Sequence, residues 1–308
     1  MLIIASGLAG AVSFNRIIYP IKTKDASGDM LVQAQPPARI VSIDPAITEI
    51  LFALNLKDRI VGVTRNCDYP EDAKKIESVG NDRSDAGKIE KLKPDLVLMN
   101  LNGQGNDLGK LRRIMLPAVT ADAKPAPMQV FAVDPKDLRD IYNTISIIGT
   151  VTNKEHSAYS LLQRMKRRVE WVEAKAKKEK ALRAVFVVKK RPLTVAADGT
   201  YQHDLMRICN FIDVSTKGKG PYPRMKREEM EKADPDIVIT GTNIAKDPKD
   251  IYNSGDFRTT GAGKNKRGVS IDAEIISRQG PRIVDALEKI AENAYGWPSQ
   301  GSGQEEGN

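Results

Sequence analysis

The sequence predicts an α/β protein of two lobes with mainly parallel sheets, joined by a single long α-helix. One observation is a phrase that occurs in both halves of the chain, at Lys88–Met99 and at Glu228–Ile239: a short amphipathic helix, a Pro-Asp corner and an apolar run. The other is an extended helical pattern between these phrases, over residues 154–180. Because each phrase reads as a helix followed by a buried strand, each half is expected to build its own sheet.

The two prolines explain why each helix of the phrase must stop. Pro94 and Pro235 cannot donate a hydrogen bond to a preceding helical turn, and they disfavour helical dihedrals in the residue before them. The runs Leu96–Met99 and Ile237–Ile239 are too short for buried helices and lack polar alternation, which is typical of central strands. Two such Rossmann-like lobes leave a cleft between them, where small ligands usually bind.

Strands and helices alternate along both halves of the chain. In the first lobe the remaining strands are expected at residues 39–43, 59–63 and 130–133, and helices at Asp44, near Tyr69 and over 137–149. In the second lobe strands are expected at 184–188, 236–239 and 269–271, and helices at 201–209, 227–232 and 281–291. Asp44 and Pro45 suit the cap and first position of the first helix, and residues 116–128, with three prolines, predict a loop.

The long helix has its own apolar pattern. Thr152-Asn153 offers a cap, and apolar residues then recur at spacings of three to four, at Leu161, Leu162, Met165, Val169 and Val172. A helix from residue 154 to residue 180 would be about 40 Å long, comparable with the diameter of a small domain. A rigid rod of that length between two lobes limits their relative motion. Its many basic residues are most simply its solvated face.

The composition limits the classes of partner. The chain has 308 residues, and its 48 Lys and Arg against 40 Asp and Glu give a net charge of +8. This excess permits attraction to anionic lipid, anionic ligands or nucleic acid, although a generally solvated basic surface is the simpler interpretation. Nucleic acid is not expected as a partner, because no basic run carries interleaved aromatic residues. Cys67 and Cys209 are expected in different lobes, so a disulfide is not expected either.

The two ends are expected to lie outside the fold. Residues 1–14 are an uncharged apolar stretch that resembles the core of a signal peptide or the start of a membrane anchor, two alternatives that the sequence leaves open. The expected division is an anchor-like segment and linker at 1–37, an N-terminal lobe at 38–150, an interdomain helix at 151–181, a C-terminal lobe at 182–295 and a disordered tail at 296–308.

Several of these segments together resemble a known family. They are residues 39–54, 61–64, 68–70, 79–80, 93–97 and 281–287, and they follow one another in the family's order. The chain resembles the substrate-binding proteins of ABC importers for iron-siderophores, haem and cobalamin. The resemblance implies two lobes joined by one long helix, a metal chelate captured in the cleft, delivery to an importer permease, and a periplasmic or outer-face membrane-anchored location.

The resemblance also assigns roles to individual residues. The ligand positions it implies are Pro45, Ala46, Ile47, Arg65, Asn81, Arg83, Asn100, Tyr222, Arg224, Thr242 and Asn243. The arginines suit an anionic chelate, because a guanidinium pairs bidentately with oxyanions. Tyr222, between two prolines, is a pre-oriented contact surface. Haem is disfavoured, because Asn81 stands where haem importers of this family place a tyrosine ligand.

Docking to the permease is implied through one surface carboxylate on each lobe. Glu228 matches the family position on the second lobe. On the first lobe the equivalent residue is Gly87, and Asp85 or Glu90 is expected to substitute. This departure keeps an alternative open, a binding or sensor module of the same fold without permease docking.

Catalysis is not expected. Only two histidines occur, and neither has an evident nucleophile beside it in the sequence. The segment Gly261–Lys264 lacks the upstream glycine and the following hydroxyl residue of a phosphate-binding loop. No metal-ligand spacing of a known type is present, so neither a resident metal nor a cofactor is expected. The sequence does not identify the chelate or the oligomeric state.

Overall fold

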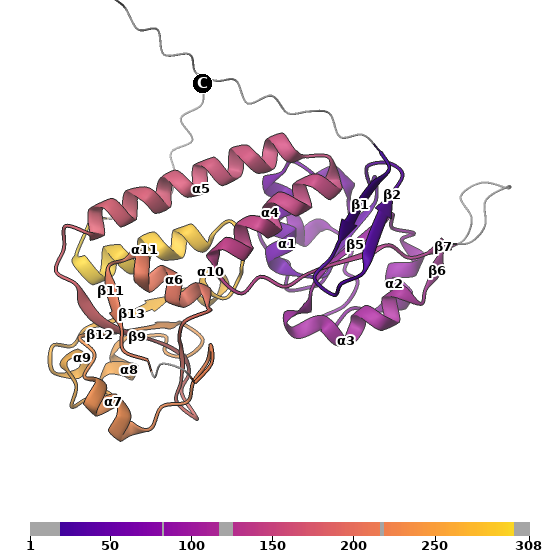
Figure 1. Cartoon of the computed structure of the whole chain (residues 1–308). Helices are drawn as coiled ribbons and strands as arrows, with labels where there is room; N and C mark the ends of the chain where they lie inside the picture. The colour runs from indigo at the N-terminus through magenta and orange to yellow at the C-terminus, as the bar shows by residue number, and fades with distance from the viewer. Residues whose placement is uncertain (1–18, 82, 117–125, 216–218, 299–308) are drawn as a thin grey trace, which may run out of the picture.

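The computed structural model describes residues 19–81, 83–116, 126–215 and 219–298. They form two α/β lobes, and the long helix α5 (Glu155–Ala176) runs along one side of both (Figure 1). The predicted fold class is therefore confirmed.

The N-terminal lobe is built on a four-stranded parallel sheet. Its strand order is β4-β3-β5-β8, with bounds Ile60–Val63, Ile40–Ser42, Leu96–Asn100 and Val130–Val133. Ile40 pairs with Leu96 and Val97 pairs with Val130, which fixes the register of the central strands. Strand β5, the strand of the first repeated phrase, is buried along its whole length, as expected for a central strand covered on both faces.

The helices of this lobe follow the strands. They are α1 (Pro45–Ala53), α2 (Ala86–Lys91), α3 (Leu101–Arg112) and α4 (Leu138–Thr152), with short 3-10 helices at Lys57–Arg59 and Glu71–Lys75. The helix expected near Tyr69 is thus only a 3-10 turn. The segment expected as a loop begins and ends in two short strands that pair with each other, β6 (Met115–Leu116) and β7 (Ala126–Pro127). The residues between them lie outside the described part of the chain.

The C-terminal lobe repeats the theme with five strands. The order is β10-β9-β12-β13, with bounds Thr194–Ala196, Leu182–Lys189, Ile237–Gly241 and Gly268–Ile271, and β11 (Phe211–Asp213) also pairs with β9. All pairings are parallel except that of β10. The helices are α6 (Tyr201–Ile208), α7 (Arg227–Ala233), α8 (Lys249–Tyr252), α9 (Gly261–Lys264), α10 (Ala273–Ile276) and α11 (Ile283–Tyr295).

Helix α5 is one unbroken helix of 22 residues, which corresponds to a length of about 33 Å. It is shorter than predicted, because Asn153 takes a left-handed conformation that ends α4 and the helical hydrogen bonding stops near Lys177. Its buried side includes Leu161, Met165 and Val172, and it packs against α4 and α11. One long helix thus runs along both lobes, as the sequence predicts.

Residues 22–37 are not a linker, contrary to the sequence analysis. They contain a β-hairpin, β1 (Ile21–Lys24) and β2 (Met30–Gln33), that packs on the N-terminal lobe. The carboxylate of Asp25 in its turn accepts hydrogen bonds from Arg112 Nη2 at 2.5 Å and from the backbone N–H of Ala132 at 3.0 Å. Leu31 of β2 is 4 % exposed and belongs to the apolar core, and the Ala26 N–H donates to the Ala132 carbonyl at 2.9 Å. The sequence analysis missed the hairpin because these contacts join residues far apart in the chain.

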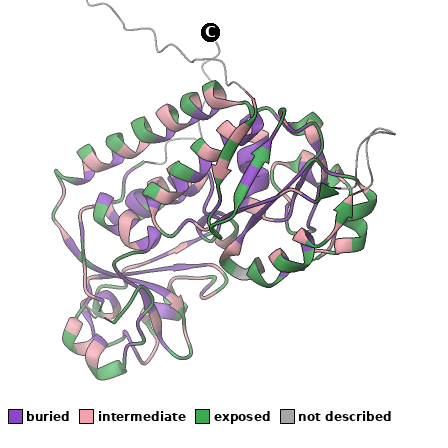
Figure 2. Cartoon of the chain, turned by 45° about the vertical axis from the view of Figure 1, so that its right-hand side comes forward, coloured by how far each residue is buried: buried purple, intermediate pink, exposed green. Residues whose placement is uncertain are grey.

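The start of the predicted tail also belongs to the fold. Trp297 is buried, stacks on Tyr295 with 5.3 Å between ring centroids, and donates its indole N–H to Glu179 at 2.9 Å. Residues 299–308 lie outside the described part. Figure 2 shows how the buried residues fill the sheets and the inner sides of the helices. Cys67 and Cys209 are both free and buried, each in its own lobe.

The hairpin attachment generates a stability prediction. Replacing Asp25 by alanine should lower the free energy of unfolding by about 3 kcal/mol, because it breaks an ion pair whose carboxylate side chain is only 1 % exposed. Asp29 contacts the same Arg112 but is 66 % exposed, so Asp29→Ala should cost less than about 1 kcal/mol. Equilibrium denaturation of the two variants checks this, and equal losses would contradict it.

Candidate functional site

The loops that leave the carboxyl ends of the parallel strands meet between the lobes. In open α/β sheets this edge is where ligands bind. Asp44 follows β3 and caps α1, accepting from the Ile47 N–H at 3.0 Å, and Asn100 ends β5 and caps α3. On the other lobe, Thr242 follows β12 and its hydroxyl accepts from the N–H of Ala273 at 2.9 Å. The polar side chains at these positions thus fix the loops that border the cleft.

An interlobe cavity of about 240 Å³ lies where these loops face each other. Its walls come from both lobes: Asp44, Pro45, Ala46 and Asn66 on one side, and Glu274, Ser277, Arg278 and Gln279 on the other. Two of the predicted ligand residues, Pro45 and Ala46, line it. Ile47, predicted with them, is only 1 % exposed and packs in the core, so its side chain offers no contact to a ligand.

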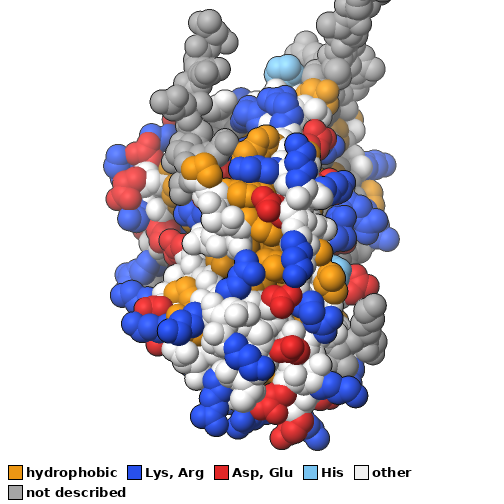
Figure 3. Space-filling view, turned by 90° about the vertical axis from the view of Figure 1, so that its left-hand side faces the viewer, with side chains coloured by type: hydrophobic (Ala, Val, Ile, Leu, Met, Phe, Trp, Pro, Cys, Tyr) orange, Lys and Arg blue, Asp and Glu red, His pale blue; other side chains and the backbone are white. Residues whose placement is uncertain are grey.

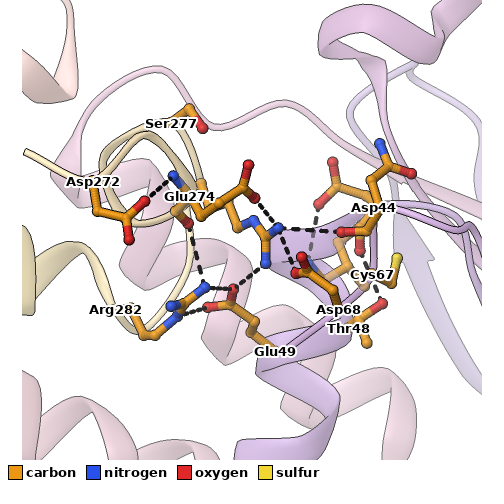
Figure 4. Close-up of polar contacts among 12 residues, drawn as sticks. Asp44, Thr48, Glu49, Cys67, Asp68, Asp272, Glu274, Ser277 and Arg282 are labelled. Carbon is orange, nitrogen blue, oxygen red and sulfur yellow. Dashed lines mark hydrogen bonds and ion pairs between the residues drawn. The ribbon is translucent and has the colours of Figure 1, made fainter. Parts of the chain in front are cut away.

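Below this cavity, five charged side chains form an interlobe ion cluster (Figure 4). Its members are Glu49 and Asp68 of the N-terminal lobe and Glu274, Arg278 and Arg282 of the C-terminal lobe. Glu49 is 3 % exposed and accepts from Arg278 Nη1 at 3.0 Å and from Arg282 Nη2 at 2.6 Å and Nε at 3.0 Å. Asp68 pairs with Arg278 Nη2 at 2.7 Å, and Glu274 contacts the same nitrogen.

Electrostatics at the cavity follow from burial and these pairings. Burial by itself would lower the pKa of Arg278, but hydrogen bonds to Asp68 and Glu49 raise it above its ordinary value, so the guanidinium stays charged. Burial raises the pKa of the Asp44 carboxyl, and the backbone N–H groups of Ile47 and Ala46 offset part of that rise.

Neutral contacts also join the lobes beside the ion cluster. Asn100 Nδ2 donates to Gln279 Oε1 at 3.3 Å, and Gln279 Nε2 donates to the carbonyl of Pro135 at 3.1 Å. Gly280 lies so close to Ala46 that an added Cβ would be 3.3 Å from its carbonyl oxygen. Asn100, a predicted ligand residue, is therefore buried and engaged in holding the lobes together.

A second hollow, of about 680 Å³, lies on the N-terminal lobe. It is lined by Arg65, Ser78, Gly80, Asn81, Arg83, Asp85 and Lys88, which brings three predicted ligand residues together. Gly80 shapes its turn, because it has φ +140° and an added Cβ would lie 2.2 Å from the Arg83 carbonyl oxygen. Asn66, the next residue after Arg65, lines the interlobe cavity instead.

The cations of this hollow are available to a ligand. Arg65 and Arg83 are exposed, and within the described residues neither guanidinium has a hydrogen-bond or ion-pair partner. The lining acid, Asp85, accepts from the Lys88 N–H at 3.1 Å as the cap of α2. The hollow therefore has an excess of positive charge, which suits carboxylate or other oxyanion groups.

The ligand residues predicted on the C-terminal lobe lie on its exposed loops. Tyr222 is 46 % exposed and donates to Gln202 Oε1 at 3.4 Å, and the exposed Arg224 bridges to Thr194 through the backbone. Asn243 is exposed beyond β12, whereas Thr242 is engaged by Ala273. The structure does not bring these four residues into the wall of the interlobe cavity.

The sequence analysis missed Glu49, Arg278 and Gln279, which join the lobes. The signal for Glu49 was a lone carboxylate between Ile47 and Ile50 in an otherwise apolar helix, since such a group is rarely buried without a cation. Within the ranges that the structure describes, no group of three His, Cys, Asp or Glu residues could hold a metal ion. In the same ranges, none of the helices has the length and apolarity needed to cross a bilayer.

Comparison with known proteins identifies the family to which this chain belongs. The family model of the periplasmic binding proteins matches residues 40–275, so the chain belongs to that family. Its relatives include an uncharacterised ABC transporter substrate-binding lipoprotein of Bacillus subtilis, 27 % identical over 90 % of this chain and 86 % of the relative. Another is the vitamin B12-binding protein of Vibrio vulnificus, 25 % identical over 85 % of this chain and 92 % of the relative.

Solved structures agree on the fold. A possible iron-binding periplasmic protein of Staphylococcus epidermidis superposes with a TM-score of 0.73 at 26 % identity, covering 85 % of this chain and all of that one. The periplasmic haem-binding protein of Vibrio cholerae gives 0.71 at 22 % identity, over 83 % of this chain and 98 % of that one. The chain is thus an extracytoplasmic substrate-binding protein of ABC transporters, and, as expected from the sequence, its family consists of binding proteins rather than enzymes.

The ion cluster predicts how firmly the lobes are joined. Glu49→Gln should lower the free energy of unfolding by about 3 kcal/mol, because it removes the charge of the buried carboxylate that pairs with the buried Arg278 and the half-buried Arg282. The matched control is Glu274→Gln, since this carboxylate also contacts Arg278 but is 61 % exposed, and it should cost less than about 1 kcal/mol. Urea denaturation is the measurement, and a Glu49→Gln variant as stable as the control would refute the assignment.

Proposed function

We propose that this chain captures a metal chelate, an iron-siderophore or a cobalamin-type ligand, between its lobes and delivers it to the permease of an ABC importer. The observation that carries the proposal is a pair of exposed guanidiniums, Arg65 and Arg83, which line the hollow on the N-terminal lobe and have no hydrogen-bond or ion-pair partner among the described residues. A guanidinium without a protein partner keeps its charge and hydrogen-bond donors for oxyanion groups, and chelates of hard metal ions often carry such groups. The names of the relatives, which include vitamin B12-binding and possible iron-binding proteins, support the same class of ligand.

The remaining predicted contacts complete the proposed site. Asn81 adds amide groups beside the two arginines, and Pro45 and Ala46 form an apolar floor in the cavity. Tyr222, Arg224 and Asn243 are exposed on the opposite lobe, where a bulky chelate that extends out of the cavity would meet them. The tyrosine ring offers an apolar contact and a polar tip. Haem remains the less favoured ligand, because the turn after Val79-Gly80 supplies an amide and no phenol.

Delivery is proposed to use carboxylates on α7 and α2. Glu228 is exposed on α7, and Glu90 is exposed on α2. Figure 1 has these two helices on different lobes and on the side of the molecule away from α5. Asp85, the other candidate, already caps α2, which makes Glu90 the better substitute for the acid that Gly87 replaces. We propose that the chain is held at the outer face of the membrane through residues 1–14.

The ligand site is tested with the two arginines together. Arg65→Ala/Arg83→Ala should weaken the binding of an anionic ferric chelate at least about tenfold, because it removes two charge-assisted contacts. Isothermal titration calorimetry measures the affinity of each variant for three ligands: a ferric citrate-type chelate, a ferric catecholate chelate and cyanocobalamin. Arg139→Ala is the control, since this arginine is 81 % exposed on α4 and does not line either hollow. Equal affinities of the wild type and the double variant for every ligand that binds would refute the proposed role.

Docking is tested by charge reversal. In cells that express the cognate permease, Glu228→Arg and Glu90→Arg should each reduce ligand uptake at least about fivefold, because the new positive charge repels the proposed permease cations. The affinity of each variant for the ligand in solution should be unchanged. Asp58→Arg is the control, an exposed acid on the N-terminal lobe next to Arg59, which contacts the end of α4. Full uptake with both reversals would favour the alternative, a sensor module of the same fold without permease docking.

A further inference from the structure

The long helix carries a row of basic side chains for which the proposed function has no use. Arg164, Arg167, Trp171, Lys175 and Lys178 follow one another at spacings of three or four residues. Residues at these spacings lie along one side of a helix, so they form a single row along α5 and the turn after it. We call this row the basic stripe. Its charges are all positive.

The acids near α5 form no ion pair with the basic stripe among the described residues. Glu173 pairs at 3.0 Å with Lys177, which lies outside the stripe. Glu170 is exposed three residues after Arg167 without an ion pair to it, and Glu179 accepts from the Trp297 indole N–H at 2.9 Å. Asp285 and Glu288 of α11 both pair with Arg168, each at 2.6 Å. Arg164, Arg167 and Lys178 are exposed, and among the residues that the structure describes no ion pair engages them. Three unneutralised cations therefore point from one side of the helix toward solvent.

An aromatic cluster lies within the same row. Trp171 is 36 % exposed and meets Trp297 edge-on, with 6.0 Å between ring centroids. Lys175 Nζ lies 4.9 Å from the Trp171 centroid and 4.0 Å from that of Trp297. Figure 3 views the molecule from the end at which α5 finishes, and blue Lys and Arg side chains there border exposed hydrophobic ones. A tryptophan flanked by cations is typical of surfaces that contact lipid headgroups.

The chain also enters the fold beside α5. Tyr19, the first residue that the structure describes, has its pKa raised by burial and by the nearby carboxylate of Glu155, in the first turn of α5. The 18 residues that precede it include the uncharged apolar stretch 1–14. A membrane attachment through that stretch would bring the beginning of α5 close to the bilayer.

We propose that the basic stripe binds the surface of an anionic lipid bilayer. The exposed cations complement anionic headgroups, and Trp171 supplies the apolar body that the interfacial layer accepts. A soluble polyanion would satisfy the charges but offers no apolar layer for the indole. Attraction of a few cations to such a surface is weak and screened by salt, so the contact is reversible.

The position of the stripe has a consequence for orientation, which rests on the proposed function. Helices α2 and α7, with the docking carboxylates proposed above, lie on the side away from α5 (Figure 1). A chain bound to lipid through the basic stripe therefore turns its docking carboxylates away from the bilayer. Lipid binding and permease docking would be alternative orientations of one tethered protein.

The test uses the full chain and vesicles without any permease. Wild type is expected to cosediment with phosphatidylcholine vesicles that contain phosphatidylglycerol, and to be released by salt. Arg164→Glu/Arg167→Glu/Lys178→Glu should weaken this binding at least about tenfold. The chain has two tryptophans, both in the aromatic cluster, so quenching of their emission by brominated lipid reports contact at this surface directly.

The control variant makes the same change in net charge elsewhere. Lys189→Glu/Lys246→Glu/Lys264→Glu alters exposed lysines on the C-terminal lobe outside α5 and should retain most of the binding. Circular dichroism confirms that both variants are folded. If both variants lost vesicle binding equally, net charge alone would explain the effect and the proposal would be overturned. It would also be overturned if the wild type bound vesicles of phosphatidylcholine alone, or soluble heparin, as tightly as vesicles that contain phosphatidylglycerol. Because no permease is present, failure here leaves the docking proposal untouched.

Discussion

The arrangement of the two lobes depends on one buried carboxylate. Glu49 has almost no contact with water, and a carboxylate in such a place is tolerated only when cations and hydrogen bonds replace its hydration. Both cations come from the other lobe, as Arg278 and Arg282. Separating the lobes would leave Glu49 on one side and the two arginines on the other without their ion-pair partners. The ion cluster therefore fixes the floor of the cleft, while α5 limits how the lobes can move along its length.

Arginines serve two opposite purposes within a short distance of each other. Arg278 is 6 % exposed and pairs with three carboxylates, so its charge is neutralised within the protein. Arg65 and Arg83 are exposed, and the described residues provide no acid that pairs with them. Only the second kind has charge left for a ligand. The difference comes from the neighbours of each guanidinium and not from the residue type, which is why composition alone could not separate the two.

The two segments that the sequence analysis wrongly left out of the fold share a physical cause. The hairpin at residues 21–33 is attached through Leu31 in the apolar core and through the Asp25–Arg112 pair, and both contacts join residues far apart in the sequence. Trp297 belongs to the fold because it meets Tyr295 and Glu179, and the glycine-rich tail around it gave no sign of that contact. Ile47 was assigned to the ligand by resemblance, although its apolar side chain follows the helical pattern toward the core. A long-range contact decided the outcome for the hairpin and for Trp297, whereas for Ile47 the local helical pattern already indicated burial.

The sequence by itself determined the repeated helix and strand of each lobe, the cap at Asp44, the single long helix and the family, because these follow from local propensities, periodicity and the order of motifs. It also brought together Arg65, Asn81 and Arg83, which lie on loops of one lobe. Only the tertiary structure decided which charges are neutralised and which remain free, and how the lobes meet at Glu49, Asn100 and Gln279. Those outcomes depend on electrostatic pairing between residues distant in the chain, and a linear pattern carries no record of such pairing.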